Sequence, residues 1–298
     1  MVDLHTHSNI SDGDLSPALL IKAAVKQGLR SLALTDHDTI KGLDSARTAA
    51  ENENFHFIPG IEININWIGG KSAPGAPGLG PGGEFHLLGL GINSPSPGFI
   101  DAVEELSRRR EARNREILDR MHELSIEANW EELMSPDQLS GKWSGGHSIG
   151  RLHFASLLVR KKIVKNVDQA FARYLGVGMP LYVPKKGMNF EEAAALIRES
   201  GGIPVMAHPV SLYVAWGRLP DLIKTLKDMG LMGLEAWHPT TKQGSCRRLE
   251  DLAKTLGLYV TEGSDYHGYA RPDRKLGYSG KGRKISESVL EAIPELMY

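Results

Sequence analysis

The sequence predicts an α/β fold, a barrel related to the TIM fold that carries a helical insertion. The 298 residues are 41% hydrophobic and 24% charged, which is an ordinary globular composition, and this length suits one large α/β domain with a smaller insertion. Short strand-like runs alternate with helical patterns along much of the chain. One long stretch, from about residue 94 to residue 184, contains helical patterns but no convincing strand.

Several of the strand-like runs are continuous and apolar, as expected for parallel strands that are buried on both faces. In chain order, the seven runs are Val2–Thr6, Ser31–Thr35, Phe57–Ile63, Phe85–Ile92, Ile203–Ala207, Met232–Ala236 and Leu258–Glu262. Seven strands that alternate with helices favour a barrel over an open sheet.

The helices between these strands have clear start and stop signals. A helix is expected over Pro17–Gln27, with Ser16 as its N-cap and Gly28 just past its end. Further helices are expected near Lys41–Glu51, Phe190–Ser200, Leu219–Met229, Ser245–Leu256 and Ser286–Leu296.

Two stretches interrupt this alternation. Gly69–Gly83 is too rich in glycine and proline for regular structure and predicts a long, mobile connection between the third and fourth strands. The stretch after residue 94 includes a strongly charged helix near Asp101–Ile126. We therefore expect the first part of a barrel in residues 1–96, a helical insertion that forms a lid over the substrate in residues 97–184, and the rest of the barrel in residues 185–298.

The overall charge and the cysteine content exclude several classes of protein. With a net charge of −1, the chain has no global field to hold a long nucleic acid duplex. Cys246 is the only cysteine, which excludes an intrachain disulfide and a sulfur-rich metal site. No apolar run reaches the ~18 residues that span a bilayer, and the first residues lack the features of a leader. We expect a cytoplasmic protein with no membrane partner.

Histidines and carboxylates recur where the predicted strands end. His5 and His7 leave the first strand with period two, so that both imidazoles can grip one metal ion from the same side. The ends of the other strands carry Asp36, His37, Asp38, Glu62, His208, Glu235, His238, Asp265 and His267. Strands of such a barrel converge at one rim, and buried polar groups are costly unless they are paired or liganded. The pattern therefore indicates a metal or catalytic site at that rim.

Two further residues have more than one interpretation. His86 lies early in the fourth strand, and a hairpin between the third and fourth strands would bring it beside Glu62. The alternative for His86 is a buried structural histidine. Asp12, in the run Ser11-Asp12-Gly13-Asp14, is either a metal ligand or a turn-capping aspartate.

Taken together, these motifs resemble the PHP (polymerase and histidinol phosphatase) superfamily of metal-dependent phosphoesterases. The matching elements are Asp3-Leu4-His5-Thr6-His7, Thr35-Asp36-His37-Asp38, Gly60-Ile61-Glu62, Ala207-His208-Pro209 and Gly263-Ser264-Asp265-Tyr266-His267. The resemblance implies a distorted (β/α)7 barrel, in agreement with the seven strands counted above.

The resemblance also implies a site for two to three divalent ions. His5, His7, Glu62 and Asp265 would hold the first, Glu62, His86 and His208 the second, and Asp12, His37 and His267 the third. Many relatives have histidine where this chain has Asp12, so the third site departs from their pattern at this position. Nitrogen and oxygen ligands without sulfur suit Mn²⁺, our first expectation, as well as Fe²⁺ or Zn²⁺.

The implied reaction is hydrolysis of a phosphate ester. A metal-bridging hydroxide would attack phosphorus, with Glu62, Asp265 and His208 as the catalytic ligands. Four nearby polar residues would orient the liganding groups, or alternatively cap the strand ends: Asp36, Asp38, Glu235 and His238.

The insertion supplies candidate phosphate ligands. Arg110 and Arg113 interrupt the apolar face of the helix Leu106–Leu124 and suit either a phosphate or internal ion pairs. The segment Gly146–Ala155 resembles that of a PHP subgroup acting on nucleoside 3′,5′-bisphosphates and short RNA ends. Arg151 matches the phosphate-binding arginine of that subgroup, and Ser148 and His153 are weaker candidates.

The subgroup implies a phosphatase that removes the 3′-phosphate of nucleoside 3′,5′-bisphosphates such as pAp. The alternative is a 5′→3′ exonuclease on short 5′-phosphorylated oligoribonucleotides. Under either activity, the expected partner of this protein is a small phosphorylated nucleotide or a short RNA end. Two other classes stay open: a C–N hydrolase of the amidohydrolase type and a non-catalytic PHP module.

Overall fold

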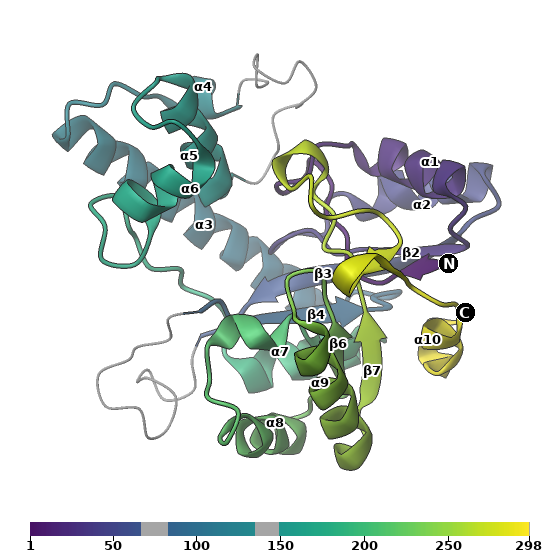
Figure 1. Ribbon diagram of the computed structural model, residues 1–298. Helices are drawn as coiled ribbons and strands as arrows, with labels where there is room; N and C mark the ends of the chain where they lie inside the picture. The colour runs from purple at the N-terminus through teal and green to yellow at the C-terminus, as the bar shows by residue number, and fades with distance from the viewer. Residues whose placement is uncertain (67–82, 135–148, 298) are drawn as a thin grey trace.

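The computed structural model describes residues 1–66, 83–134 and 149–297, and it places all seven predicted strands in one sheet (Figure 1). The strands lie in the sheet in chain order. Their bounds are β1 Val2–Asp3, β2 Ser31–Leu34, β3 His56–Asn64, β4 His86–Leu90, β5 Ile203–Met206, β6 Gly233–Trp237 and β7 Tyr259–Glu262. A separate two-stranded hairpin consists of β8 Tyr278–Ser279 and β9 Arg283–Lys284.

The sheet is mixed and nearly closed. Strand β4 runs antiparallel to both β3 and β5, whereas the other neighbouring strands are parallel. In the β3–β4 pairing, Asn64 lies opposite His86, so the start of β4 meets the end of β3. A single parallel bridge from Thr6 to Tyr266 joins the two edges of the sheet. This arrangement confirms the predicted distorted seven-stranded barrel.

The barrel helices follow the predicted punctuation. They are α1 Pro17–Gln27, α2 Leu43–Asn52, α7 Phe190–Glu199, α8 Leu219–Asp228, α9 Gln243–Leu256 and α10 Ser288–Glu291. Ser16 caps α1 by accepting a hydrogen bond from the Leu19 amide, and Gly28 ends it with a φ of 80°. The last helix is shorter than the expected Ser286–Leu296. Pro294, which lacks an amide hydrogen and disfavours helix at the residue before it, begins a separate 3₁₀ turn.

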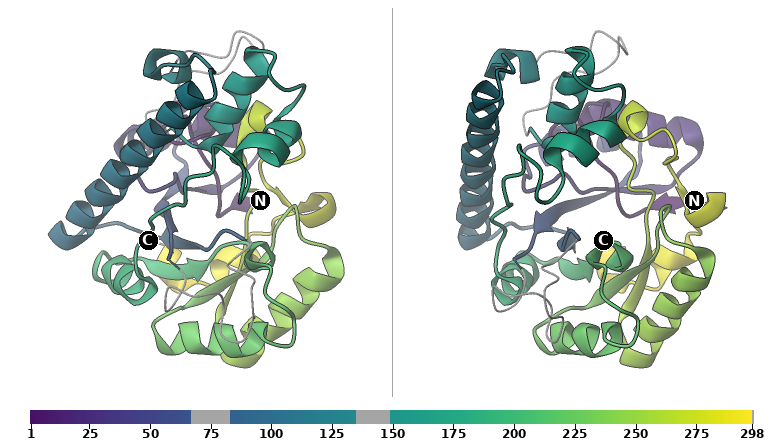
Figure 2. Two further views of the ribbon diagram at one scale, coloured as in Figure 1. Left: turned by 90° about the vertical axis from the view of Figure 1, so that its left-hand side faces the viewer. Right: turned by 60° about the vertical axis from the view of Figure 1, so that its left-hand side comes forward.

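The predicted helical insertion contains a second hydrophobic core. Its elements are α3 Pro97–Glu123, α4 Trp130–Met134, α5 Arg151–Arg160 and α6 Val167–Ala170, which continues into a π-helical turn, Phe171–Leu175. Figure 2 shows α3 as a long rod along one side of the molecule. The beginning of α3 packs into the barrel core through Phe99, and its later part packs with Phe154 in the separate core. The division into 1–96, 97–184 and 185–298 stays a prediction.

The glycine-rich connection, Gly69–Gly83, lies outside the described residues except for Gly83. Within residues 1–66, 83–134 and 149–297, none of the helices combines the length and the apolar character needed to cross a bilayer.

Candidate metal and phosphate site

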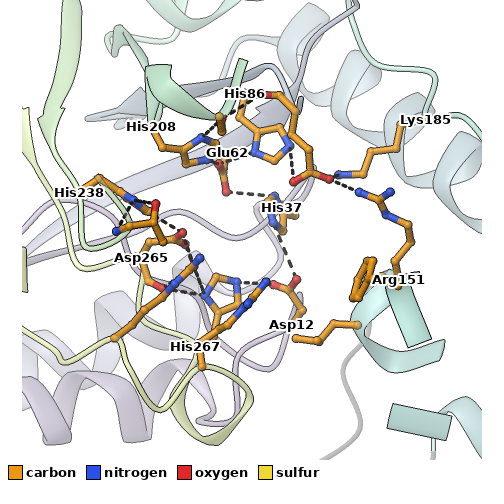
Figure 3. A pocket seen from close by; sticks show the side chains of 18 of the residues that line it. Asp12, His37, Glu62, His86, Arg151, Lys185, His208, His238, Asp265 and His267 are labelled. Atoms are coloured by element: carbon orange, nitrogen blue, oxygen red, sulfur yellow. Dashed lines mark hydrogen bonds and ion pairs between the residues drawn. The ribbon is translucent and has the colours of Figure 1, made fainter. Parts of the chain in front are cut away.

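The fold brings the nine predicted metal-ligand candidates together at one end of the barrel. Figure 3 shows those that line the cavity above them. Residues on segments that follow β1, β2, β5 and β7 meet there with the C-terminal part of β3. Because β4 is antiparallel, its first residue, His86, lies at the same end. The nine residues are His5, His7, Asp12, His37, Glu62, His86, His208, Asp265 and His267, and we call them the strand-end cluster.

Glu62 lies at the centre of the strand-end cluster. Its Oε1 is 2.7 Å from His86 Nδ1 and 3.0 Å from His208 Nε2. Its Oε2 is within 3.3 Å of one ring nitrogen on each of three other histidines, His5, His7 and His37. The side chain is only 1% exposed. Each oxygen of this carboxylate therefore faces a different set of imidazoles.

Two aspartates complete the strand-end cluster. Asp265 Oδ1 is 3.2 Å from His7 Nε2 and 3.4 Å from His267 Nδ1. Asp12 Oδ1 is 3.2 Å from His267 Nε2, and its Oδ2 is 3.8 Å from His37 Nε2. Asp12 therefore joins the group as the sequence motif predicts, rather than serving only to cap a turn.

The donor set fits divalent metal ions. Three groups each offer ligand atoms within 4.8 Å of one another: His7, Asp12, His37 and His267; His5, His7 and Asp265; and His37, Glu62 and His86. Asp12 Oδ1 and His37 Nδ1 are buried, and although they lie 3.2 Å from His267 Nε2 and 3.1 Å from Glu62 Oε2, neither contact has the geometry of a hydrogen bond. Buried nitrogen and oxygen donors without sulfur suit hard or borderline cations such as Mn²⁺, Fe²⁺ and Zn²⁺.

The charges in the strand-end cluster stabilise one another. Burial opposes ionisation of Glu62, but the imidazoles of His37 and His86 outweigh burial and hold the pKa of this carboxyl well below its usual range. Burial likewise opposes the charged form of His5, but the carboxylates of Glu235 and Glu62 raise its pKa well above the ordinary value. The carboxylates are therefore ionised at neutral pH and able to bind cations.

The backbone around the strand-end cluster is tightly constrained. His208 and Asp265 have positive φ angles of 27° and 49°, a region that non-glycine residues rarely adopt and that is concentrated at functional sites. A Cβ atom at Gly263 would lie 2.3 Å from His5 Cβ and 2.7 Å from Glu235 Oε1. Glycine at this position therefore allows the β7 segment to approach His5 closely.

Of the four predicted orienting residues, two contact the strand-end cluster directly. Glu235 Oε1 lies 3.0 Å from His5 Nδ1, and its Oε2 accepts a hydrogen bond from the His208 amide at 2.7 Å. His238 Nε2 is 3.0 Å from Asp265 Oδ2.

The other two, Asp36 and Asp38, have different partners from the imidazoles that we expected. Asp36 accepts a hydrogen bond from the hydroxyl of Ser8 and another from that of Ser11, and both serines lie on the loop after β1. Asp38 accepts from Asn64 and pairs with Arg110.

A cavity of about 230 Å³ opens above the strand-end cluster. It is lined by Arg110, Arg151 and Lys185 from the insertion and the segment just after it, and by Arg271 and Arg274 from the segment that follows β7. Arg274 pairs with Asp265. Figure 3 shows Arg151 and Lys185 next to each other on the side of His86. The cavity can therefore attract anions.

Two of the remaining candidates from the insertion, Arg113 and His153, are not among the residues that line the cavity. Arg113 is buried and donates from Nε to the Val183 carbonyl at 2.9 Å. His153 is buried, and its Nδ1 accepts a hydrogen bond from the Gly150 amide at the start of α5. This contact gives His153 a helix-capping role. Ser148 lies outside the described residues.

Sequence reasoning missed several residues of the cavity. Lys185 had a usable signal, since it begins a Lys-Lys pair directly after Pro184, where the barrel was expected to resume. Arg271 and Arg274 follow His267 closely, but no period or motif singled them out. Ser211, whose Oγ lies 2.7 Å from His208 Nδ1, stands in a largely apolar run, and no motif singled it out.

Comparison with known proteins finds bacterial relatives along most of the chain. A 5′-3′ exoribonuclease of Haemophilus influenzae is 33% identical over 89% of this chain and 89% of its own length. A 3′,5′-nucleoside bisphosphate phosphatase of Chromobacterium violaceum is 29% identical, covering 93% and 91%. A phosphoribosyl 1,2-cyclic phosphate 1,2-diphosphodiesterase of Eggerthella lenta is also 29% identical, covering 89% and 94%.

Solved structures agree with these matches. A protein from C. violaceum, described as an amidohydrolase with bound sulfate and no metal, superposes with a TM-score of 0.81 at 27% identity, covering 98% of this chain and 96% of its own. A candidate metal-dependent phosphoesterase from Bifidobacterium adolescentis gives 0.80 at 25% identity, covering 99% and 96%. The family profile described as the PHP domain matches residues 3–175. The chain therefore belongs to the PHP domain family of phosphoesterases.

Proposed function

We propose that this protein is a metal-dependent phosphatase that removes the 3′-phosphate from nucleoside 3′,5′-bisphosphates such as pAp. One observation carries the proposal: a buried set of metal-competent ligands and three cationic side chains, Arg110, Arg151 and Lys185, line the same cavity. A substrate with two phosphates on one sugar can use both parts at once. The similarity to a bisphosphate phosphatase over 93% of the chain supports this choice.

The strand-end cluster would hold two to three divalent ions, with Mn²⁺ as our first choice. Glu62 would bridge two of them, because its two oxygens face different imidazoles. When bound, such ions neutralise the charge of a phosphoryl group and acidify a water molecule for attack on phosphorus. Glu235 would hold the His5 ring in place, and Ser211 would do the same for His208.

Arg151 would orient the substrate through its second, non-reacting phosphate. A guanidinium matches the geometry of a phosphate group, and Arg151 stands at the first turn of α5, where amide groups also favour an anion. Binding energy from that remote phosphate would position the reacting one.

A 5′→3′ exonuclease on short 5′-phosphorylated oligoribonucleotides is the second candidate. Arg271 and Arg274 favour it, since they line the same cavity from the segment after β7 and could meet a further phosphate of a continuing chain. The Haemophilus influenzae relative, named a 5′-3′ exoribonuclease, supports the same choice.

One assay separates the two candidates. The purified protein with Mn²⁺ is given pAp or a 5′-phosphorylated trinucleotide RNA at equal concentration, and released phosphate and released nucleotide are both measured. The proposal expects a larger kcat/KM for pAp, and a larger value for the trinucleotide would favour the exonuclease. Failure to hydrolyse any phosphate ester with Mn²⁺, Fe²⁺ or Zn²⁺ would reject both and leave the C–N hydrolase or the non-catalytic module.

A further inference from the structure

Glu84 is an acidic residue among the cations of the cavity. It precedes His86, the first residue of β4, by two residues. Its carboxylate pairs with Arg151 and, at 3.1 Å, with Lys185 Nζ. Its other oxygen lies 3.9 Å from His86 Nε2. We call Arg110, Arg151 and Lys185 the insertion-side cations. Glu84 thus lies between two of these cations and His86, a member of the strand-end cluster.

The positive charge around Glu84 is not fully balanced. Arg110, Arg113, Arg151 and Lys185 interact with one another here. Burial together with Arg151 and Arg110 lowers the pKa of Arg113 to about 9. Burial, again with the other cations, lowers the pKa of Lys185. Among the described residues, the carboxylates that form ion pairs with these four cations are Asp38 and Glu84. A dianionic ligand would relieve this repulsion.

The two carboxylates differ in how firmly they are held. Asp38 is 6% exposed and accepts hydrogen bonds from the Asn64 amide and side chain besides its pair with Arg110. Glu84 is 43% exposed in the cavity wall. It also has an alternative position nearby, because His86 Nε2 is buried and has no hydrogen-bond partner within the described residues. Glu84 can therefore move where Asp38 cannot.

We propose that Glu84 is the built-in counter-ion of the phosphate subsite and thereby sets its specificity. In the free protein its carboxylate occupies Arg151 and Lys185. The non-reacting phosphate of the substrate takes its place, and Glu84 turns towards His86 Nε2. Weakly binding anions cannot displace the carboxylate, whereas a phosphate dianion with more charge and more acceptor atoms can. This inference rests on the proposed function for the identity of the displacing group.

The test replaces Glu84 with glutamine, which keeps the shape and removes the charge. Full-length protein loaded with Mn²⁺ is titrated calorimetrically with AMP and with inorganic phosphate. We expect Glu84→Gln to bind both about tenfold more tightly, as for removal of one like charge beside a phosphate. Glu84→Ala should tighten binding in the same direction. Glu105→Gln is the matched control, since Glu105 also pairs with two arginines but lies outside the cavity lining.

Other roles for Glu84 give different results. If Glu84 only holds Arg151 and Lys185 in position, both variants will bind AMP and phosphate more weakly or unchanged, and the inference is wrong. If it contacts the sugar, AMP binding alone will weaken, which also overturns it. With pAp as substrate, KM should fall more than kcat changes. If Glu84→Gln binds AMP more tightly but the protein does not hydrolyse pAp, the proposed function is wrong and the counter-ion role stands. If the protein hydrolyses pAp but Glu84→Gln leaves the affinity for AMP unchanged, the proposed function stands and the counter-ion role is wrong.

Discussion

The strand-end cluster and the insertion-side cations share one cavity, yet they differ in burial and in charge balance. In the cluster, His5 and His7 are fully buried, Glu62 is 1% exposed, and each carboxylate faces imidazoles. On the insertion side, the side chains of Arg151 and Glu84 are 17% and 43% exposed, and cations outnumber their acidic partners. The first region is buried and rigidly paired, as the proposed metal site requires. The second is adjustable, and it gains charge balance from what binds there.

The strongest test of this difference is Glu62→Gln. The amide cannot supply two anionic oxygens to the surrounding imidazoles and ions, so we expect roughly a thousandfold loss of phosphate release from pAp. Metal content, measured by elemental analysis, should fall in parallel. Glu105→Gln serves as the control and should retain both. An active variant with its full metal content would show that Glu62 does not bridge ions.

The insertion side should respond selectively. Arg151→Ala removes a guanidinium that lines the cavity, and we expect kcat/KM for pAp to fall about thirtyfold, or about 2 kcal/mol. Hydrolysis of p-nitrophenyl phosphate, which has no second phosphate, should change little. Arg108→Ala, on the exposed face of α3, is the control and should behave as the unchanged protein. Equal losses on both substrates would mean that Arg151 is structural.

The same contrast explains how far the sequence could be interpreted. The strand-end cluster follows from one rule, that strands of a barrel end at the same rim, and even His86 could be placed beside Glu62 from an expected hairpin. Asp36 and Asp38 obey that rule but bond elsewhere, because chain direction alone does not choose between an imidazole, a serine and an arginine.

The insertion side follows no such rule. Lys185 and Glu84 are about a hundred residues apart in sequence. They meet because the segment after the insertion pairs with the end of β3, through the bridge between Ile65 and Met188. The helical periodicity placed Arg110 and Arg113 on the same face of one helix. It could not show that Arg113 would donate to the Val183 carbonyl instead of lining the cavity. Long-range pairs of this kind leave no periodic signal in one sequence.

The smallest expected effect concerns the rigidity of the strand-end cluster. Gly263→Ala places a methyl group 2.3 Å from His5 Cβ and 2.7 Å from Glu235 Oε1, and both neighbours are buried and hydrogen-bonded to each other. Because neither can move freely, we expect a loss of about 1–3 kcal/mol in the free energy of unfolding, measured by urea denaturation.

Gly244→Ala is the matched control for that change. A Cβ at Gly244 meets nothing within 4 Å, and the residue lies in the first turn of α9, so alanine there should leave stability unchanged or raise it by up to about 1 kcal/mol. If Gly263→Ala is as stable as Gly244→Ala, the β7 segment can yield and the cluster is not preorganised. If it is less stable but Mn²⁺ restores its stability, the ligands still converge and the loss comes from the barrel. If Mn²⁺ does not restore it, the ligands are displaced, because only converging ligands let bound ions stabilise the protein.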